Sequence, residues 1–122
     1  MSPGIRKTMR LRRRQDYLAV QRSGTKVHGR HFLALVAASP AGAVAAGSLG
    51  RLGITVTKRV GNAVTRNRIK RLVREWMRLH GWVPAGRDVV IIAKEGAATV
   101  RGLADVAIDL ERLAARVATA RC

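Results

Sequence analysis

Acidic residues are scarce in this sequence. Of its 122 residues, 24 are Lys or Arg and only 7 are Asp or Glu, so the formal net charge is +17 at pH 7. Such a surplus disfavours a compact chain through self-repulsion, and it indicates a polyanionic partner, nucleic acid before anionic membrane. Metal-assisted phosphodiester hydrolysis needs carboxylates gathered around one site, and the seven acids are scattered. The sequence therefore predicts a binding protein with no catalytic residues of its own.

Cysteine and long apolar runs are also lacking. Cys122 is the only cysteine, which excludes an internal disulfide or paired-cysteine metal site and fits a reducing cytoplasm. His28, His31 and His80 do not have metal-ligand spacing. No stretch approaches the roughly 20 apolar residues of a membrane span, and basic residues interrupt the N-terminal segment, so no signal peptide is expected. These absences predict a cytoplasmic protein without a metal site or a membrane partner.

Apolar residues make up 48% of the chain, enough for a real core. The length suits one compact domain. Residues 1–13 are basic and almost without periodicity, which predicts a flexible arm. Residues 14–118 are expected to form a single domain and residues 119–122 a tail. Small residues, Pro and Gly mark Ser39–Gly50 as a loop.

The hydrophobic pattern predicts helices and strands in a mixed order. Helical spacing is found at Arg14–Arg22, in the stretch after Gly61 and at Val100–Ala118. Short apolar or alternating runs predict strands at Thr25–His28, His31–Ala38, Arg51–Thr57 and Asp88–Lys94. The order α-β-β-β-α-β-α defines an α+β protein with helices packed on a small sheet. In the last helix, Asp105 and Asp109 are expected on an outer face balanced by Arg112 and Arg116.

The stretch GNAVTRNRIKRLVRE, residues 61–75, carries five basic residues and one acid. Ile69, Leu72, Val73 and Trp76 stand at i, i+3, i+4 and i+7, so they form a stripe that should face the sheet. Asn62 is a plausible N-cap, and Thr65 is a competing candidate.

A row of like charges runs down another side of this helix. Arg66, Lys70 and Arg74 stand at i, i+4 and i+8. Like charges at this spacing oppose an isolated helix by a few tenths of a kcal/mol per pair, about the size of a favourable ion pair. Burial of the apolar stripe can offset this, at roughly 1.5–3 kcal/mol for each large side chain. Phosphates bound to the row would turn repulsion into charge-assisted hydrogen bonds. The row therefore indicates a polyanion-binding surface.

The Arg-Asn-Arg triplet at residues 66–68 carries a family resemblance. TKRVGNAVTRNRIKRLVREWMR, residues 57–78, resembles the signature of the bacterial ribonuclease P protein subunit. RRRQDYLAVQRSG, HGRHFLALV and DVVIIAK, each at its place in the chain, are similar to the first helix and two strands of that family. The likeness implies a mostly antiparallel sheet of about four strands with three helices, and an unusual left-handed βαβ crossover, against the general right-handed rule.

The resemblance also implies a function. A catalytic RNA subunit would perform the Mg²⁺-dependent cleavage that removes the 5′ leader from precursor tRNA, and one protein per RNA would bind that RNA and the single-stranded leader. The Mg²⁺ would belong to the RNA subunit and not to a dedicated protein site. The positions implied for RNA contact are Lys58, Arg59, Asn62, Arg66, Asn67, Arg68, Lys70, Arg71 and Arg74. Tyr17 and Phe32 match the aromatics of a leader-binding cleft, and a core position stays the open alternative for Phe32 because it lies in an apolar strand. Gln21 replaces a second aromatic that many members carry.

Two other functions fit part of this pattern. A ribosomal-type structural RNA-binding protein would share the charge, the size and the small sheet. A DNA-binding module could place the basic helix in a major groove, although the sequence contains no paired helix-turn-helix pattern. Cleavage of precursor tRNA after addition of a catalytic RNA would distinguish a ribonuclease P subunit from both of these alternatives.

Overall fold

The computed structural model describes residues 10–11, 13–40, 50–80, 83 and 86–119. Its elements are α1 (Arg14–Ser23), β1 (Thr25–His28), β2 (Phe32–Ala38), β3 (Arg51–Thr55), α2 (Ala63–His80), β4 (Arg87–Ala93), the 3₁₀ helix η2 (Glu95–Thr99) and α3 (Leu103–Thr119). The predicted order of three helices and four strands is confirmed, and among the described elements only η2 was not expected. Of the predicted loop after β2, residues 41–49 lie outside the described part.

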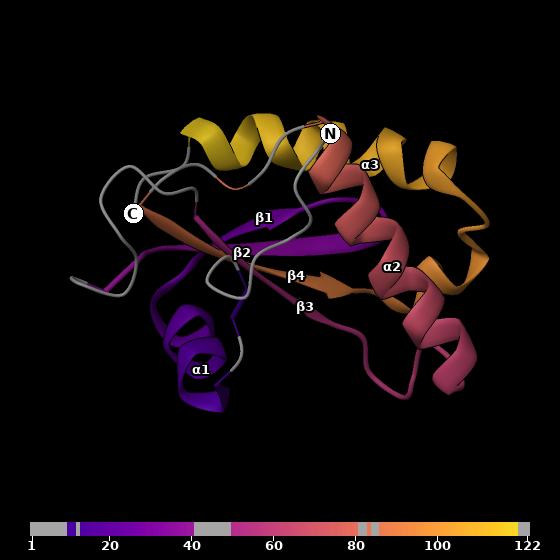
Figure 1. The fold of residues 1–122 in the computed structure, drawn as a ribbon, viewed down its shortest axis with the longest axis horizontal. Helices are drawn as coiled ribbons and strands as arrows, with labels where there is room; N and C mark the ends of the chain where they lie inside the picture. The colour runs from indigo at the N-terminus through magenta and orange to yellow at the C-terminus, as the bar shows by residue number, and fades with distance from the viewer. Residues whose placement is uncertain (1–9, 12, 41–49, 81–82, 84–85, 120–122) are drawn as a thin grey trace.

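The four strands form one mixed sheet in the order β1-β2-β4-β3 (Figure 1). β1 pairs antiparallel with β2, and β2 pairs antiparallel with β4. β3 and β4 are parallel neighbours joined through α2, so β3-α2-β4 is a βαβ unit. The left hand implied for this crossover by the resemblance stays a prediction. The unit places the basic helix directly after β3, the strand at one end of the sheet order.

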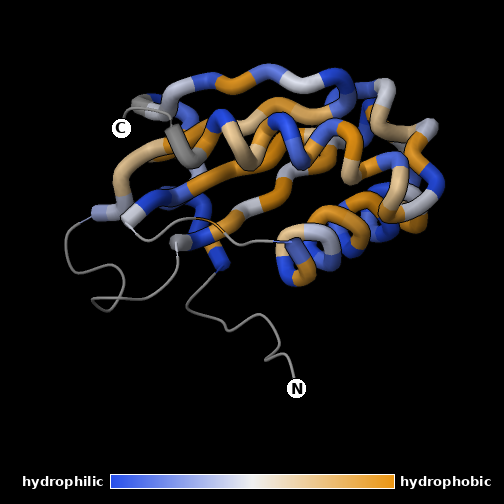
Figure 2. Tube along the Cα trace, turned by 90° about the horizontal axis from the view of Figure 1, so that it is seen from above, coloured by the Kyte–Doolittle hydropathy of each residue, from blue (hydrophilic) through white to orange (hydrophobic). Residues whose placement is uncertain are grey.

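The helices lie on opposite faces of the sheet. α2 and α3 contribute to the larger core together with one face of the strands, whereas α1 packs on the other face. In Figure 2 the helical traces alternate between hydrophilic and hydrophobic residues, and the central strands are mostly hydrophobic. The core on the α1 side is small and is built from Leu11, Val20, Leu35, Ala37 and Val90. The two faces are therefore unequally covered.

The prediction of a flexible arm through residue 13 is wrong for Arg10 and Leu11. Arg10 forms a parallel bridge with Leu52 of β3, and the Leu11 amide donates to the Leu52 carbonyl at 2.9 Å. Leu11 is also 4% exposed and belongs to the smaller core. Pairing satisfies backbone groups at the outer edge of β3 that would otherwise stay open. The folded domain therefore includes Arg10 and Leu11, while residues 1–9 and 12 lie outside the described part.

Phe32 occupies the larger core, so of the two alternatives left open for it the leader-binding cleft is wrong. Its side chain is fully buried and clusters with Ala34 and Val36 of the same strand. Alternate residues of a strand point to opposite faces, and Phe32 shares the face that α2 and α3 cover. A ring without exposed surface cannot stack on a base.

Asp109 of α3 is buried, contrary to the expectation of an outer face balanced by arginines. Its carboxylate accepts hydrogen bonds from the backbone amides of Arg30, His31 and Phe32 at 2.7, 2.9 and 2.9 Å. These amides lie at the turn between β1 and β2. One carboxylate thus satisfies three backbone donors that a turn leaves open, and it fixes α3 to that end of the sheet.

Replacement of Asp109 should therefore destabilise the domain. Asp109→Asn keeps the shape but turns one acceptor oxygen into a donor facing a backbone amide. Because hydrogen bonds to charged groups contribute about 1.5–3 kcal/mol each, we expect the free energy of unfolding to fall by about 2–4 kcal/mol. Urea denaturation measures this change. Glu111→Gln, an exposed neighbour on the same helix, is the matched control and should change stability little; equal losses in both variants would contradict a specific role for the Asp109 carboxylate.

Candidate nucleic-acid interface

Helix α2 begins as its sequence predicts. The Thr65 amide donates to Oδ1 of Asn62 at 2.9 Å, so Asn62 is the N-cap and the competing candidate Thr65 lies inside the helix. Ile69, Val73 and Trp76 are buried against the sheet, together with Met77. The predicted stripe is confirmed, with Leu72 partly buried beside it. This stripe fixes which side of α2 faces outward.

The predicted basic residues of α2 lie outside its buried stripe. Arg66, Arg68, Lys70 and Arg74 are half-buried, and Asn67 and Arg71 are exposed. Within the described part of the chain, Arg66, Arg68, Lys70 and Arg71 form no ion pair or side-chain hydrogen bond. The Nε atoms of Arg66 and Arg68 are buried without an acceptor. Guanidinium groups held against the protein surface without internal partners have their outer donors available for a polyanion.

Lys58 and Arg59 extend this surface beyond the helix. They lie in the turn between β3 and α2, and both are exposed. The buried residues Val56 and Val60 flank the turn, and the Val60 amide donates to the Thr57 carbonyl at 3.1 Å. Apolar anchors on either side therefore direct the two cations outward, next to the first turn of α2. We call Lys58, Arg59 and the basic residues of α2 from Arg66 to Arg74 the α2 basic surface.

The only acid of α2 does not neutralise this surface. Glu75 forms an ion pair with Arg78, one turn further along, and this hydrogen bond raises the pKa of Arg78. The pKa of Arg74 is lowered, mainly by burial and further by the charge of Arg10, while Tyr17 opposes the shift. The pKa of Arg74 is therefore influenced by a residue of the N-terminal segment and by a residue of α1. The α2 basic surface reaches the edge of the sheet where Tyr17 lies.

Tyr17 lies on the α1 side of the sheet. Its ring packs against Gly53 of β3, because a Cβ atom at Gly53 would lie 2.6 Å from Tyr17 Cε1. Tyr17 is half-buried, and the partly buried Leu33 and Ile92 belong to the same cluster. Gly53 was missed as a site residue. A glycine within a strand often marks the close approach of another group, and this signal could have found it.

No group of three or more His, Cys, Asp or Glu residues that could hold a metal ion is present in the described residues. Among the same residues, none of the helices is long and apolar enough to span a bilayer. The arrangement that remains is a basic helical surface beside a half-buried aromatic ring. Fold and surface together define a small α+β protein of the RNA-binding class.

Comparisons with known proteins identify the family. The family model described as Ribonuclease P matches residues 5–118. A ribonuclease P protein component from Syntrophus aciditrophicus is 40% identical over 107 residues, which cover 87% of this chain and 84% of that protein. The component from Desulfatibacillum aliphaticivorans is 47% identical over 90 residues, covering 73% and 71%.

Solved structures agree. The RNase P protein of Staphylococcus aureus, determined at 2.0 Å, superposes with a TM-score of 0.75 at 29% identity, covering 90% of this chain and 94% of that chain. The RNase P protein of Thermotoga maritima gives a TM-score of 0.73 at 31% identity, covering 88% and 96%. The chain belongs to the ribonuclease P protein family, and it is a subunit of the enzyme that matures the 5′ end of tRNA.

Proposed function

We propose that this chain is the non-catalytic, RNA-binding subunit of a ribonuclease P whose RNA subunit cleaves the precursor. The observation that carries this proposal is the α2 basic surface, whose arginines lack internal partners among the described residues. Removal of a 5′ leader needs phosphodiester hydrolysis, and the Mg²⁺ ions for this reaction would be held by the RNA subunit. The protein would contribute binding and neutralisation of phosphate charge.

The α2 basic surface would contact the catalytic RNA. Lys58, Arg59, Asn67 and Arg71 are exposed, so their side-chain donors can reach phosphates. Arg66, Arg68, Lys70 and Arg74 lie half-buried between them and present cations at fixed positions. Asn62 uses Oδ1 for its cap, so only its amide donors remain for RNA.

The α1 side would take the single-stranded leader of precursor tRNA. Tyr17 supports this role because its ring is half-buried and held on Gly53, with apolar neighbours beside it. Stacking of a base on an aromatic ring is worth roughly 1–3 kcal/mol and tolerates any base. That tolerance suits an enzyme that must process many different leaders. We further propose one protein per RNA in the cytoplasm, where precursor tRNA is the substrate.

Reconstitution tests the proposed division of labour. The purified protein alone should not cleave precursor tRNA, because its described acids form no cluster for metal ions. Together with a bacterial ribonuclease P RNA it should increase cleavage at limiting Mg²⁺, since the protein supplies positive charge that the RNA otherwise draws from ions. The measurement is the single-turnover rate as a function of Mg²⁺ concentration. Cleavage by the protein after rigorous removal of RNA would refute a non-catalytic role.

Salt dependence tests contact between the α2 basic surface and the RNA subunit. Each phosphate neutralised releases counterions, so Arg66→Ala or Lys70→Ala should reduce the log–log salt slope of RNA affinity by roughly 0.7–0.9. Protein stability should hold or rise by a few tenths of a kcal/mol, because Arg66→Ala removes one like-charge i+4 pair and Lys70→Ala removes two. Filter binding at several salt concentrations and thermal unfolding measure the two effects.

Ile69→Ala is the matched control for that experiment, because Ile69 lies next to Lys70 in the sequence but faces the core. It should lower the free energy of unfolding by about 2–5 kcal/mol and leave the salt slope unchanged. If Arg66→Ala is destabilised and keeps the parental salt slope of RNA affinity, the charged row stabilises the fold and does not bind the RNA subunit.

Tyr17→Ala tests the leader surface. The holoenzyme should bind precursor tRNA more weakly, by roughly 1–3 kcal/mol if one stacked base is lost, and mature tRNA with unchanged affinity. Tyr17→Phe is the control, since it keeps the ring and should keep leader binding. Dissociation constants for both RNAs report the result, and equal losses for precursor and mature tRNA would show that Tyr17 acts on the fold instead.

A further inference from the structure

Helix α1 is held on the sheet by very few side chains. Among its residues with described side chains, only Val20 is fully buried, and Asp16 and Tyr17 are partly buried. Its C-terminal end is fixed because β1 follows at once, with the Gly24 amide donating to the Val20 carbonyl at 2.7 Å. The N-terminal half, which carries Tyr17, needs another attachment. A helix with so small a buried face can change its tilt at little cost.

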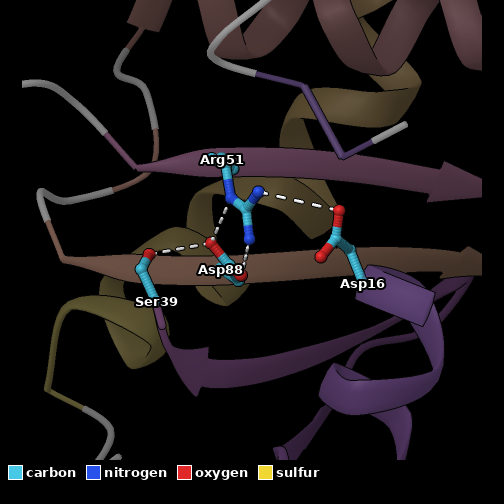
Figure 3. Close-up of polar contacts among 4 residues, drawn as sticks. All are labelled: Asp16, Ser39, Arg51 and Asp88. Carbon is cyan, nitrogen blue, oxygen red and sulfur yellow. Dashed lines mark hydrogen bonds and ion pairs between the residues drawn. The ribbon is translucent and has the colours of Figure 1, made fainter. Parts of the chain in front are cut away.

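A chain of charges supplies that attachment (Figure 3). Arg51 of β3 donates from Nε to Asp88 Oδ1 at 3.0 Å and from Nη2 to Asp88 Oδ2 at 2.7 Å. Asp88 of β4 is 2% exposed and also accepts from Ser39 Oγ at 2.8 Å. The two-pronged hydrogen bond with Asp88 is the main cause that raises the pKa of Arg51. Arg51 is therefore a rigid cation fixed in the sheet.

Asp16 binds the remaining side of this cation. Its Oδ2 lies 3.7 Å from Arg51 Nη1 and comes from α1, whereas Arg51 and Asp88 come from neighbouring strands. The next residue of α1 is Tyr17, and Gly53, on which its ring lies, is two residues beyond Arg51 in the same strand. Residues two apart in a strand share a face. Asp16 and Tyr17 thus engage the same face of β3 at adjacent positions.

We propose that Asp16 and Arg51 are positioning residues, which hold α1 at the tilt that places Tyr17 on Gly53 for the 5′ leader. This inference rests on the proposed leader role of Tyr17. Asp88 orients the Arg51 guanidinium, and the ion pair of Asp16 with this guanidinium fixes α1 relative to β3. Gly53 leaves room for the Tyr17 ring. The device sets the affinity for leader-bearing RNA through Tyr17.

The sign of the effect separates positioning from simple electrostatics. Asp16→Asn removes a negative charge from a protein of net charge +17, so electrostatics alone would strengthen binding to any RNA. Positioning predicts the reverse for one ligand only: the affinity of the reconstituted holoenzyme for precursor tRNA should fall about two- to fivefold, the range for losing one partly exposed ion pair. Affinity for mature tRNA and for the RNA subunit should not fall. Glu111→Gln, an exposed acid of α3, gives the same change of charge and should not weaken leader binding.

A double-mutant cycle with Tyr17 tests whether Asp16 acts through the ring. In the Tyr17→Ala background, Asp16→Asn should have no further effect on precursor binding, because the group that it positions is gone. Asp16→Glu should restore part of the affinity. Gly53→Ala is an independent variant, since its Cβ would displace the ring; it should weaken precursor binding in the parental protein and have no effect with Tyr17→Ala.

The outcomes distinguish this inference from the proposed function. If Tyr17→Ala weakens precursor binding but Asp16→Asn does not, or if the two losses add in full, the positioning role is overturned and the leader role stands. Equal losses for precursor and mature tRNA in Asp16→Asn would show a general effect on the fold and also overturn positioning. If Tyr17→Ala leaves precursor binding intact, the leader role itself fails, and positioning through Tyr17 fails with it.

Discussion

The placement of a few carboxylates is the constraint on which the rest of the structure depends. The chain has seven acids against 24 cations, and the structure uses five of the acids internally. Asp88 and Asp109 are buried; one holds Arg51 and Ser39, and the other holds three backbone amides. Asp16 reaches Arg51, Asp105 accepts the Arg101 amide at the start of α3, and Glu75 pairs with Arg78. Asp88 fixes a strand pair, Asp109 fixes a turn, and Asp16 and Asp105 lie near the starts of their helices, so none of these acids is paired with the basic residues of α2 from Arg66 to Arg71.

The α2 basic surface is the consequence of that placement. Like charges at i+4 spacing oppose the isolated helix, and no acid of the described chain is paired with Arg66, Arg68, Lys70 or Arg71. The helix is stable because Ile69, Val73 and Trp76 are buried on its other side, where each large apolar side chain contributes roughly 1.5–3 kcal/mol. Hydrophobic burial thus stabilises a cationic face that the free protein does not neutralise. In the proposed function, the donors of this face would bind RNA and not groups within the fold.

The sequence could predict features that depend on local period and spacing. The order of elements, the apolar stripe of α2 and the possible cap at Asn62 follow from helical and strand periodicity. Phe32 could not be placed in the same way, because β2 reads FLALVAA with apolar residues on both faces, so alternation does not say which face meets the larger core. Asp109 and the pair Arg51–Asp88 depend on contacts between residues 77–79 and 37 positions apart. The local sequence pattern carries no information on such distant pairs. In the structure, the burial of Asp88 and Asp109 shows that the fold depends on them, because a buried charge is costly unless it is paired.

In the proposed function, the two sheet faces would let one small domain bind two kinds of RNA segment. α2 and α3 close the larger core and leave their outer sides for charge, which suits a structured RNA read through its backbone. α1 covers the other face with one buried valine and a tyrosine, so apolar side chains such as Leu33 and Ile92 stay partly exposed beside an aromatic ring. Unpaired bases need such a surface, because their own apolar faces must leave water. Arg74 is influenced by both Arg10 and Tyr17, so it would join the helix proposed to bind phosphates to the face proposed to bind bases, without a second domain.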